Sequence, residues 1–77
     1  MTLKEAYIKI VNENDNWVFG PILEKENYFI FSGHPTNGEN DTIFELPSFN
    51  KSSKNIEWID ISHGIEKTIR KINPEDL

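Results

Sequence analysis

The chain has 77 residues, no cysteine and a formal net charge of −5. Neither a disulfide nor a thiolate-bound zinc ion can stabilise it, so a hydrophobic core has to do so. Residues 1–45 carry eight acidic and three basic side chains, whereas residues 46–77 carry five of each. Because phosphate binding depends on clustered Lys and Arg, this distribution disfavours direct nucleic-acid binding and favours attraction to a basic protein surface.

The N-terminal residues lack the basic stretch followed by an apolar run that is typical of a signal peptide. No apolar run approaches the roughly 18–20 residues that a membrane span needs. With no cysteine to indicate export, we expect a cytoplasmic protein without a membrane partner.

Residues 2–13 have the pattern of an amphipathic helix. Thr2-Leu3-Lys4-Glu5 matches a capping box, in which the Thr2 side chain and the Glu5 side chain each accept a backbone N–H of the other residue. Apolar residues then recur at three- and four-residue spacing, at Leu3, Ala6, Tyr7, Ile10 and Val11. The Asn- and Asp-rich residues 12–16 are expected to end the helix.

The next two segments read as a β-hairpin. Residues 17–23 are β-prone but contain Gly20-Pro21, which predicts an edge strand or a bulged strand. Residues 24–27 form a short polar turn. Residues 28–32 are the most apolar run in the chain, with apolar side chains on both alternating faces, and they predict a central strand. Residues 33–41 are expected to form a long exposed loop.

The second half of the chain predicts two more strands and a helix. Residues 42–46 begin a strand; if Pro47 and Ser48 form a bulge, Phe49 returns to the face that Phe44 and Leu46 share, and the strand runs on to Asn50. A polar turn over 51–55 leads to a strand over 56–61. Ser62 then acts as an N-cap of a helix whose apolar stripe is Ile65, Ile69 and Ile72. Asn73-Pro74 ends this helix, and residues 73–77 are a frayed tail.

These elements predict a single α+β domain over residues 1–77. Its fold is a four-stranded antiparallel meander with an N-terminal helix packed on the sheet and a C-terminal helix, in the order α-β-β-β-β-α. Since the central strand is apolar on both faces, both faces of the sheet need cover. The second helix provides it for the second face, or else a protein partner or a second copy does.

Three short stretches resemble small bacterial YrhB-type and immunity-protein-like domains. They are Glu5–Ile10 in the first helix, Tyr28–Ser32 in the central strand, and Phe49–Ser53, where Asn50 replaces the family's Asp and Ser52-Ser53 stand near its Thr-Gly. The resemblance implies a cystatin-like wrapped sheet and a role in binding and neutralising a partner protein. It implies no catalytic residues.

Catalytic and metal-binding constellations are weak in this sequence. His34 and His63 lack the ligand spacing of a metal site, even with Asp41 or Asp60 nearby. Ser48 or Ser62 can be combined with His63 and Asp60, but neither serine lies in a nucleophile elbow. The Gly33–Gly38 loop has no lysine after its second glycine, so it is not a phosphate loop. We therefore expect no catalytic residues, no metal and no cofactor.

The remaining functional signal is a set of acidic side chains that comes together if the 24–27 turn and the 33–41 loop lie on the same side of the domain. Its members are Glu24, Glu26, Glu39, Asp41 and Glu45. They predict a non-enzymatic acidic binding module, an inhibitor or immunity-like protein that covers a basic surface on a toxin or a nucleic-acid-binding enzyme. The alternatives are a phage-encoded DNA mimic that inhibits a nucleic-acid-binding defence enzyme, and a homodimeric structural or regulatory subunit.

Overall fold

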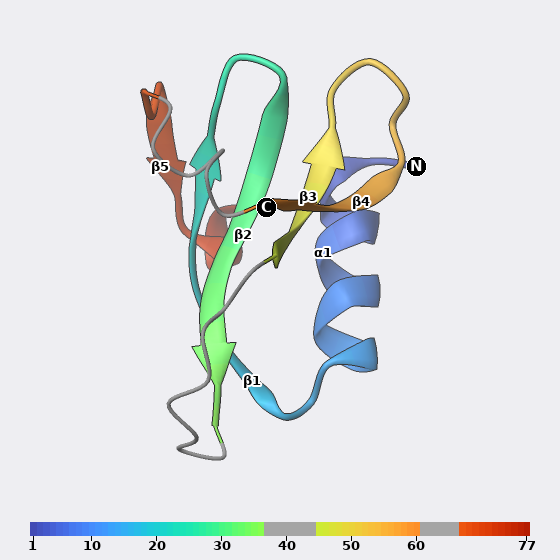
Figure 1. Ribbon diagram of the computed structural model, residues 1–77, viewed down its shortest axis with the longest axis vertical. Coiled ribbons are helices and arrows are strands. Elements are labelled where there is room, and N and C mark those ends of the chain that lie inside the picture. Colours follow the sequence, from blue (N-terminus) through green and yellow to red (C-terminus); the bar gives the residue numbers. More distant parts are fainter. Residues whose placement is uncertain (37–44, 61–66) are drawn as a thin grey trace.

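A computed structural model describes residues 1–36, 45–60 and 67–77. Within these residues, one α-helix, α1 (Leu3–Glu13), precedes five strands and a final single-turn 3-10 helix (Figure 1). The strands are β1 (Trp17–Glu24), β2 (Tyr28–Pro35), β3 (Glu45–Asn50), β4 (Ile56–Asp60) and β5 (Arg70–Ile72), and the 3-10 helix is η2 (Pro74–Asp76).

The strands form one open antiparallel sheet in the order β4-β3-β2-β1-β5. The predicted antiparallel sheet with an N-terminal helix is therefore confirmed, and β2 occupies the predicted central place. The prediction of four strands is wrong, because β5 adds a fifth at the outer side of β1.

The C-terminal segment differs most from the prediction. We expected a helix from 62 to 72, but Arg70–Ile72 is a strand and only the 3-10 turn η2 follows it. Residues 62–66 lie outside the described residues. Ile72 pairs with Ile22 of β1, and Ile69 is 58% exposed, so these two isoleucines do not share one buried helical stripe. The tail is not a frayed end either, because Leu77 packs against the core.

The helix α1 begins as its sequence predicts. The Glu5 amide donates to the Thr2 hydroxyl at 3.1 Å, and the Thr2 amide donates to the Glu5 carboxylate at 2.9 Å. Ala6 and Ile10 are its fully buried residues. In the parts of the chain that the structure describes, no helix is long and apolar enough to cross a membrane.

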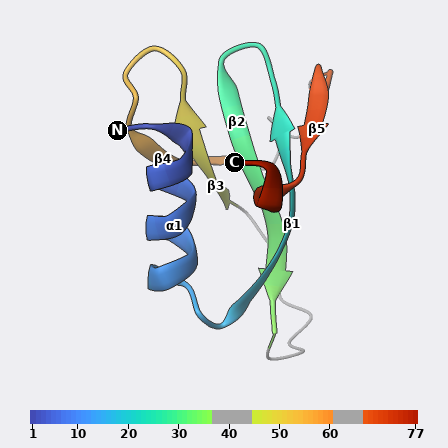
Figure 2. The same ribbon diagram turned by 180° about the vertical axis from the view of Figure 1, so that it is seen from behind.

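The main core lies on one face of the sheet, between the strands and α1. Its buried members are Ala6, Ile10, Ile22, Phe31 and Phe49. Both α1 and η2 lie on this face and are seen in front of the strands in Figure 2. On the opposite face, Ile30 and Ile59 are also buried. The predicted covering helix for that face falls partly on residues outside the described ranges.

The first hairpin contains the predicted bulge. Gly20 and Pro21 of β1 stand opposite the single residue Ser32, because the register shifts between Phe19 and Ile22. The Ser32 hydroxyl donates to the Pro21 carbonyl, which holds the bulge. Beyond it, β2 does not stop at Ser32 as predicted but pairs with β1 as far as Pro35, so residues 33–35 are strand rather than loop.

Strand β3 has no bulge at Pro47 and Ser48, which corrects the prediction. Pro47 pairs with Trp58 and Ser48 with Glu57 in an unbroken register. Residues 42–44, where the predicted strand began, lie outside the described ranges. Phe49 therefore lies on the opposite face from Leu46.

Pro47 accounts for the end of the pairing between β2 and β3. The Lys51 amide donates to the Asn27 carbonyl at 3.0 Å, so the odd-numbered backbone positions of β3 are those that face β2. Pro47 is the next such position beyond Phe49, and it has no N–H to donate. Going from the β3–β4 turn back along β3, the last pair is Ile30 with Ser48, and Pro47 is the next residue.

We predict that Gly33→Ala destabilises the fold by about 1–3 kcal/mol, the usual cost of overpacking. A Cβ atom at Gly33 would lie 2.5 Å from the backbone carbonyl oxygen of Val18, which cannot move without disturbing the hairpin. Gly20→Ala is the matched control, since its Cβ would meet only the Ser32 hydroxyl at 3.1 Å. Urea unfolding of both variants measures the difference, and equal midpoints would contradict the close approach of the two strands.

Candidate functional site

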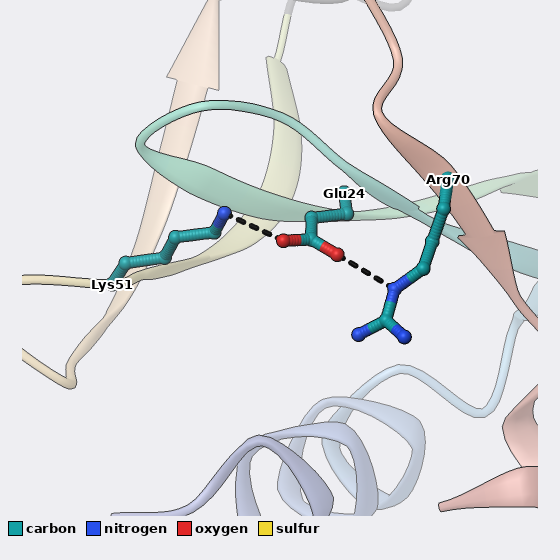
Figure 3. Close-up of polar contacts among 3 residues, drawn as sticks. All are labelled: Glu24, Lys51 and Arg70. Atoms are coloured by element: carbon teal, nitrogen blue, oxygen red, sulfur yellow. Dashed lines mark hydrogen bonds and ion pairs between the residues drawn. The ribbon is translucent and has the colours of Figure 1, made fainter.

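Glu24 is the most strongly engaged of the predicted site residues. Its carboxylate accepts from Lys51 Nζ at 2.8 Å through one oxygen and from Arg70 Nε at 2.7 Å through the other (Figure 3). The Glu24 side chain is only 16% exposed. Such charge-assisted bonds are stronger than bonds between neutral groups.

These contacts have a clear electrostatic effect on Glu24. The hydrogen bonds from Lys51 and Arg70 hold the pKa of the carboxyl below its ordinary value, and partial burial opposes them only weakly. Glu24 is therefore ionised at neutral pH, with both of its oxygens occupied.

The partners of Glu24 come from distant parts of the chain. Arg70 lies directly opposite Glu24 in the β1–β5 ladder, and Lys51 begins the turn between β3 and β4. The Lys51 ammonium also lies 5.0 Å from the ring centroid of Phe29, within range of a cation–π contact. Glu24 thus connects β1 to β5 and to the β3–β4 turn. Its carboxylate forms structural ion pairs within the fold and is not an acidic group left open to a partner.

Of the other predicted acidic residues, the structure describes Glu26 and Glu45, and these two do not gather around Glu24. Glu26 is exposed in the β1–β2 turn, and Glu45 is exposed at the start of β3. Glu45 is at one end of β3, and the β1–β2 turn lies beside Lys51, just past the other end. The length of β3, about 17 Å, therefore separates Glu45 from this turn. Glu39 and Asp41 lie outside the described residues. Their role in binding stays a prediction.

A different acidic surface appears at the edge strand β4. Glu45 pairs with Asp60, and next to them Pro47 pairs with Trp58. We call these four residues the β4 edge surface. The Asn50 amide donates to the Asn55 carbonyl, so Glu45–Asp60 and Pro47–Trp58 are both non-hydrogen-bonded pairs, whose side chains come closest. Two exposed carboxylates therefore lie on one face beside a tryptophan that is 43% exposed.

Trp58 is the outer end of a row of aromatic rings that leads into the core. The centroids of Trp58 and Trp17 lie 6.1 Å apart, and those of Trp17 and Phe19 lie 6.2 Å apart. Tyr7 contacts both Phe19 and the buried Phe31. The row fixes the position of Trp58, although the residue is exposed at the edge of the sheet.

The residues considered for catalysis do not form a site in the described structure. The buried Ser48 hydroxyl donates to the Glu57 carbonyl at 2.7 Å, and His34 is exposed on β2. Ser62 and His63 lie outside the described ranges. Within residues 1–36, 45–60 and 67–77, no group of three or more His, Asp or Glu side chains is placed to hold a metal ion.

Sequence reasoning also missed a buried lysine. Lys25 was expected in an exposed turn, yet its side chain is 1% exposed and its Nζ donates to the Thr68 hydroxyl at 2.7 Å. A polar turn sequence contains no signal that separates one buried lysine from its exposed neighbours. Lys25 ties the first hairpin to the segment that leads into β5.

The chain matches no protein-family model, no curated protein and no solved structure. The resemblance to YrhB-type and immunity-protein-like domains therefore stays a prediction.

We predict that Glu24→Gln lowers the free energy of unfolding at pH 7 by about 1–2 kcal/mol, because it weakens two charge-assisted bonds. The folded-state pKa of Glu24 is depressed, so its contribution is present above the unfolded-state value and is lost as pH falls through the folded-state value. The difference between parent and variant should shrink below about pH 4.3, the ordinary glutamate value.

Chemical denaturation from pH 7 down to pH 3 measures this difference. Glu5 also has a lowered pKa, from its bonds to Thr2, but it titrates in both proteins and cancels in the comparison. Glu26→Gln, in the exposed turn, is the control and should change little. A pH-independent difference between parent and Glu24→Gln would contradict an ionic role for Glu24.

Proposed function

We propose that this chain is an acidic, non-enzymatic binding module that inhibits or neutralises another protein by covering a basic surface on it, as an immunity-like protein does. The observation that carries the proposal is the β4 edge surface. There, Glu45 and Asp60 stand directly opposite each other, beside the half-exposed Trp58.

The exposed tryptophan is costly to the isolated chain, because it forgoes the gain of burial. It becomes favourable against a partner that places an apolar group over the ring and Lys or Arg near the exposed Glu45. Tryptophan is among the residues that most often dominate interface energetics, and complementary charge speeds encounter.

The net charge of −5 acts in the same direction over a longer range. It attracts a basic partner and repels a second acidic copy. Glu24 contributes little to this attraction, because Lys51 and Arg70 neutralise it. Exposed acids such as Glu26 and Glu45 remain available to a partner.

The test compares three single charge reversals at exposed glutamates: Glu45→Lys in the β4 edge surface, Glu26→Lys in the β1–β2 turn and Glu75→Lys in η2. Each changes the net charge by the same amount. After capture of the partner from the source cells, we expect Glu45→Lys to slow association at least fivefold more than the other two. Association of the parent should slow as salt rises, since the Debye length is about 8 Å at physiological ionic strength.

The same variant makes a prediction that needs no partner. Glu45→Lys replaces a like-charge pair with an opposite-charge pair, so it should raise the stability of the free chain by about 0.2–1 kcal/mol. Glu26→Lys and Glu75→Lys should lie within about ±0.5 kcal/mol of the parent. A Glu45→Lys variant that binds the partner as fast as Glu75→Lys would contradict the β4 edge surface as the binding site.

A further inference from the structure

Besides the facing edges of β2 and β3 beyond Ile30 and Ser48, the described residues leave three stretches of strand edge unpaired, and these three differ in how they are protected. Strand β5 is three residues long and carries the exposed Arg70 and Lys71. The part of β1 beyond β5 contains the Gly20–Pro21 bulge. Short strands, bulges, proline and basic side chains all block pairing with another chain.

Strand β4 is protected only by the negative charge of Glu57 and Asp60. It runs for five residues, Ile56–Asp60, in an unbroken register with β3, and contains no proline, glycine or basic residue. Among the described residues, no strand pairs with its outer side. Its two acidic residues repel an acidic strand but attract a basic one.

The hydrogen-bond pattern identifies the outward-facing backbone groups of β4. Because the Asn50 amide donates to the Asn55 carbonyl, the backbone of Asn55, Glu57 and Ile59 faces β3. The Ser48 hydroxyl bond to the Glu57 carbonyl agrees with this alternation. The N–H and C=O groups of Ile56 and Trp58 therefore point away from the sheet, at its edge.

We propose that the partner binds by strand addition: an extended, basic segment pairs with the outer edge of β4, using the backbone of Ile56 and Trp58. Its Lys or Arg side chains face Glu45, and its apolar side chains cover the Trp58 ring. Main-chain bonds supply affinity in this mode, and alternate side chains supply specificity. Charge decides between occupants, because a second copy would bring another net charge of −5 to the same edge. This inference rests on the proposed function and specifies how the partner is recognised.

The test uses a blocked seven-residue peptide with Lys and Val in turn at positions 1, 3, 5 and 7 and Thr between them, so that one face of the extended peptide carries both Lys and Val. Its effect is measured by amide hydrogen exchange of the isotopically labelled chain. In the free chain, the Ile56 and Trp58 amides should exchange much faster than those of Glu57 and Ile59. Saturating peptide should slow exchange at Ile56 and Trp58 at least tenfold and leave Glu57 and Ile59 unchanged.

Two control peptides separate the possible causes of binding. A fully N-methylated peptide keeps the charge but cannot donate backbone hydrogen bonds to the Ile56 and Trp58 carbonyls, and its methyl groups keep it from approaching the strand edge, so it should not protect these amides. If it binds as well as the parent peptide, strand addition is wrong while the proposed acidic binding function stands. A peptide with Glu in place of Lys should not bind; if it binds equally well, the proposed function itself fails.

Two further outcomes would overturn the inference. Slow exchange at Ile56 and Trp58 in the free monomer would mean that the edge is already covered. Protection that disappears on dilution would mean that a second copy occupies it.

Trp58→Pro removes the outward N–H without removing a bond to β3, and Trp58→Thr removes only the ring. Trp58→Thr should bind the peptide more weakly than the parent, and Trp58→Pro should not bind it measurably.

Discussion

The missing amide hydrogen of Pro47 is the constraint on which the shape of this sheet depends. Pro47 occupies the position in β3 that would donate to β2 after Phe49, so pairing between the two strands ends at Ser48. From there, β2 continues with β1 alone and β3 continues with β4 alone. Proline is tolerated here because only one of its two neighbouring strands still pairs with it.

The core and the aromatic rings hold the two pairs of strands together beyond that point. Ala6 and Ile10 of α1 share one cluster with Phe31 of β2 and Phe49 of β3. Trp17 of β1 reaches Trp58 of β4, although these strands are not neighbours in the sheet. Apolar contact thus replaces backbone pairing, and it leaves Trp58 half exposed at the edge.

The opposite end of the sheet is held by charge. Glu24 joins β5 and the β3–β4 turn to the first hairpin through Arg70 and Lys51. Among the described members of the predicted acidic set, Glu24 is bound within the fold, and Glu26 and Glu45 lie near opposite ends of β3.

The sequence predicts the elements that depend on local patterns. The capping box at Thr2 and Glu5, the bulge at Gly20-Pro21 and the central place of Tyr28–Ser32 all follow from neighbouring residues, and the structure confirms them. The isoleucine spacing that predicted a C-terminal helix fails, because Ile72 pairs with a strand fifty residues earlier in the chain. Such a partner cannot be read from a local period.

The candidate site, too, could be predicted from the sequence only in part. The acidic excess is visible in the composition, but Glu24 is neutralised by residues 27 and 46 positions away. The opposition of Glu45 and Asp60 depends on the register across the 51–55 turn. Counting outward from a plain turn over 51–55 pairs Asn50 with Ile56 and so Glu45 with Ile61, one residue away from the observed register, because Asn50 already bonds to Asn55.

The most direct test of the central constraint is a nuclear Overhauser spectrum of the labelled chain. In an antiparallel ladder, α-protons come closest in the non-hydrogen-bonded pairs, which here are Tyr28–Asn50 and Ile30–Ser48. The account predicts strong cross-peaks for these two pairs, none for Ser32–Leu46, and contacts between the indole rings of Trp17 and Trp58. A strong Ser32–Leu46 cross-peak would mean that the ladder continues past Pro47, and it would contradict the account.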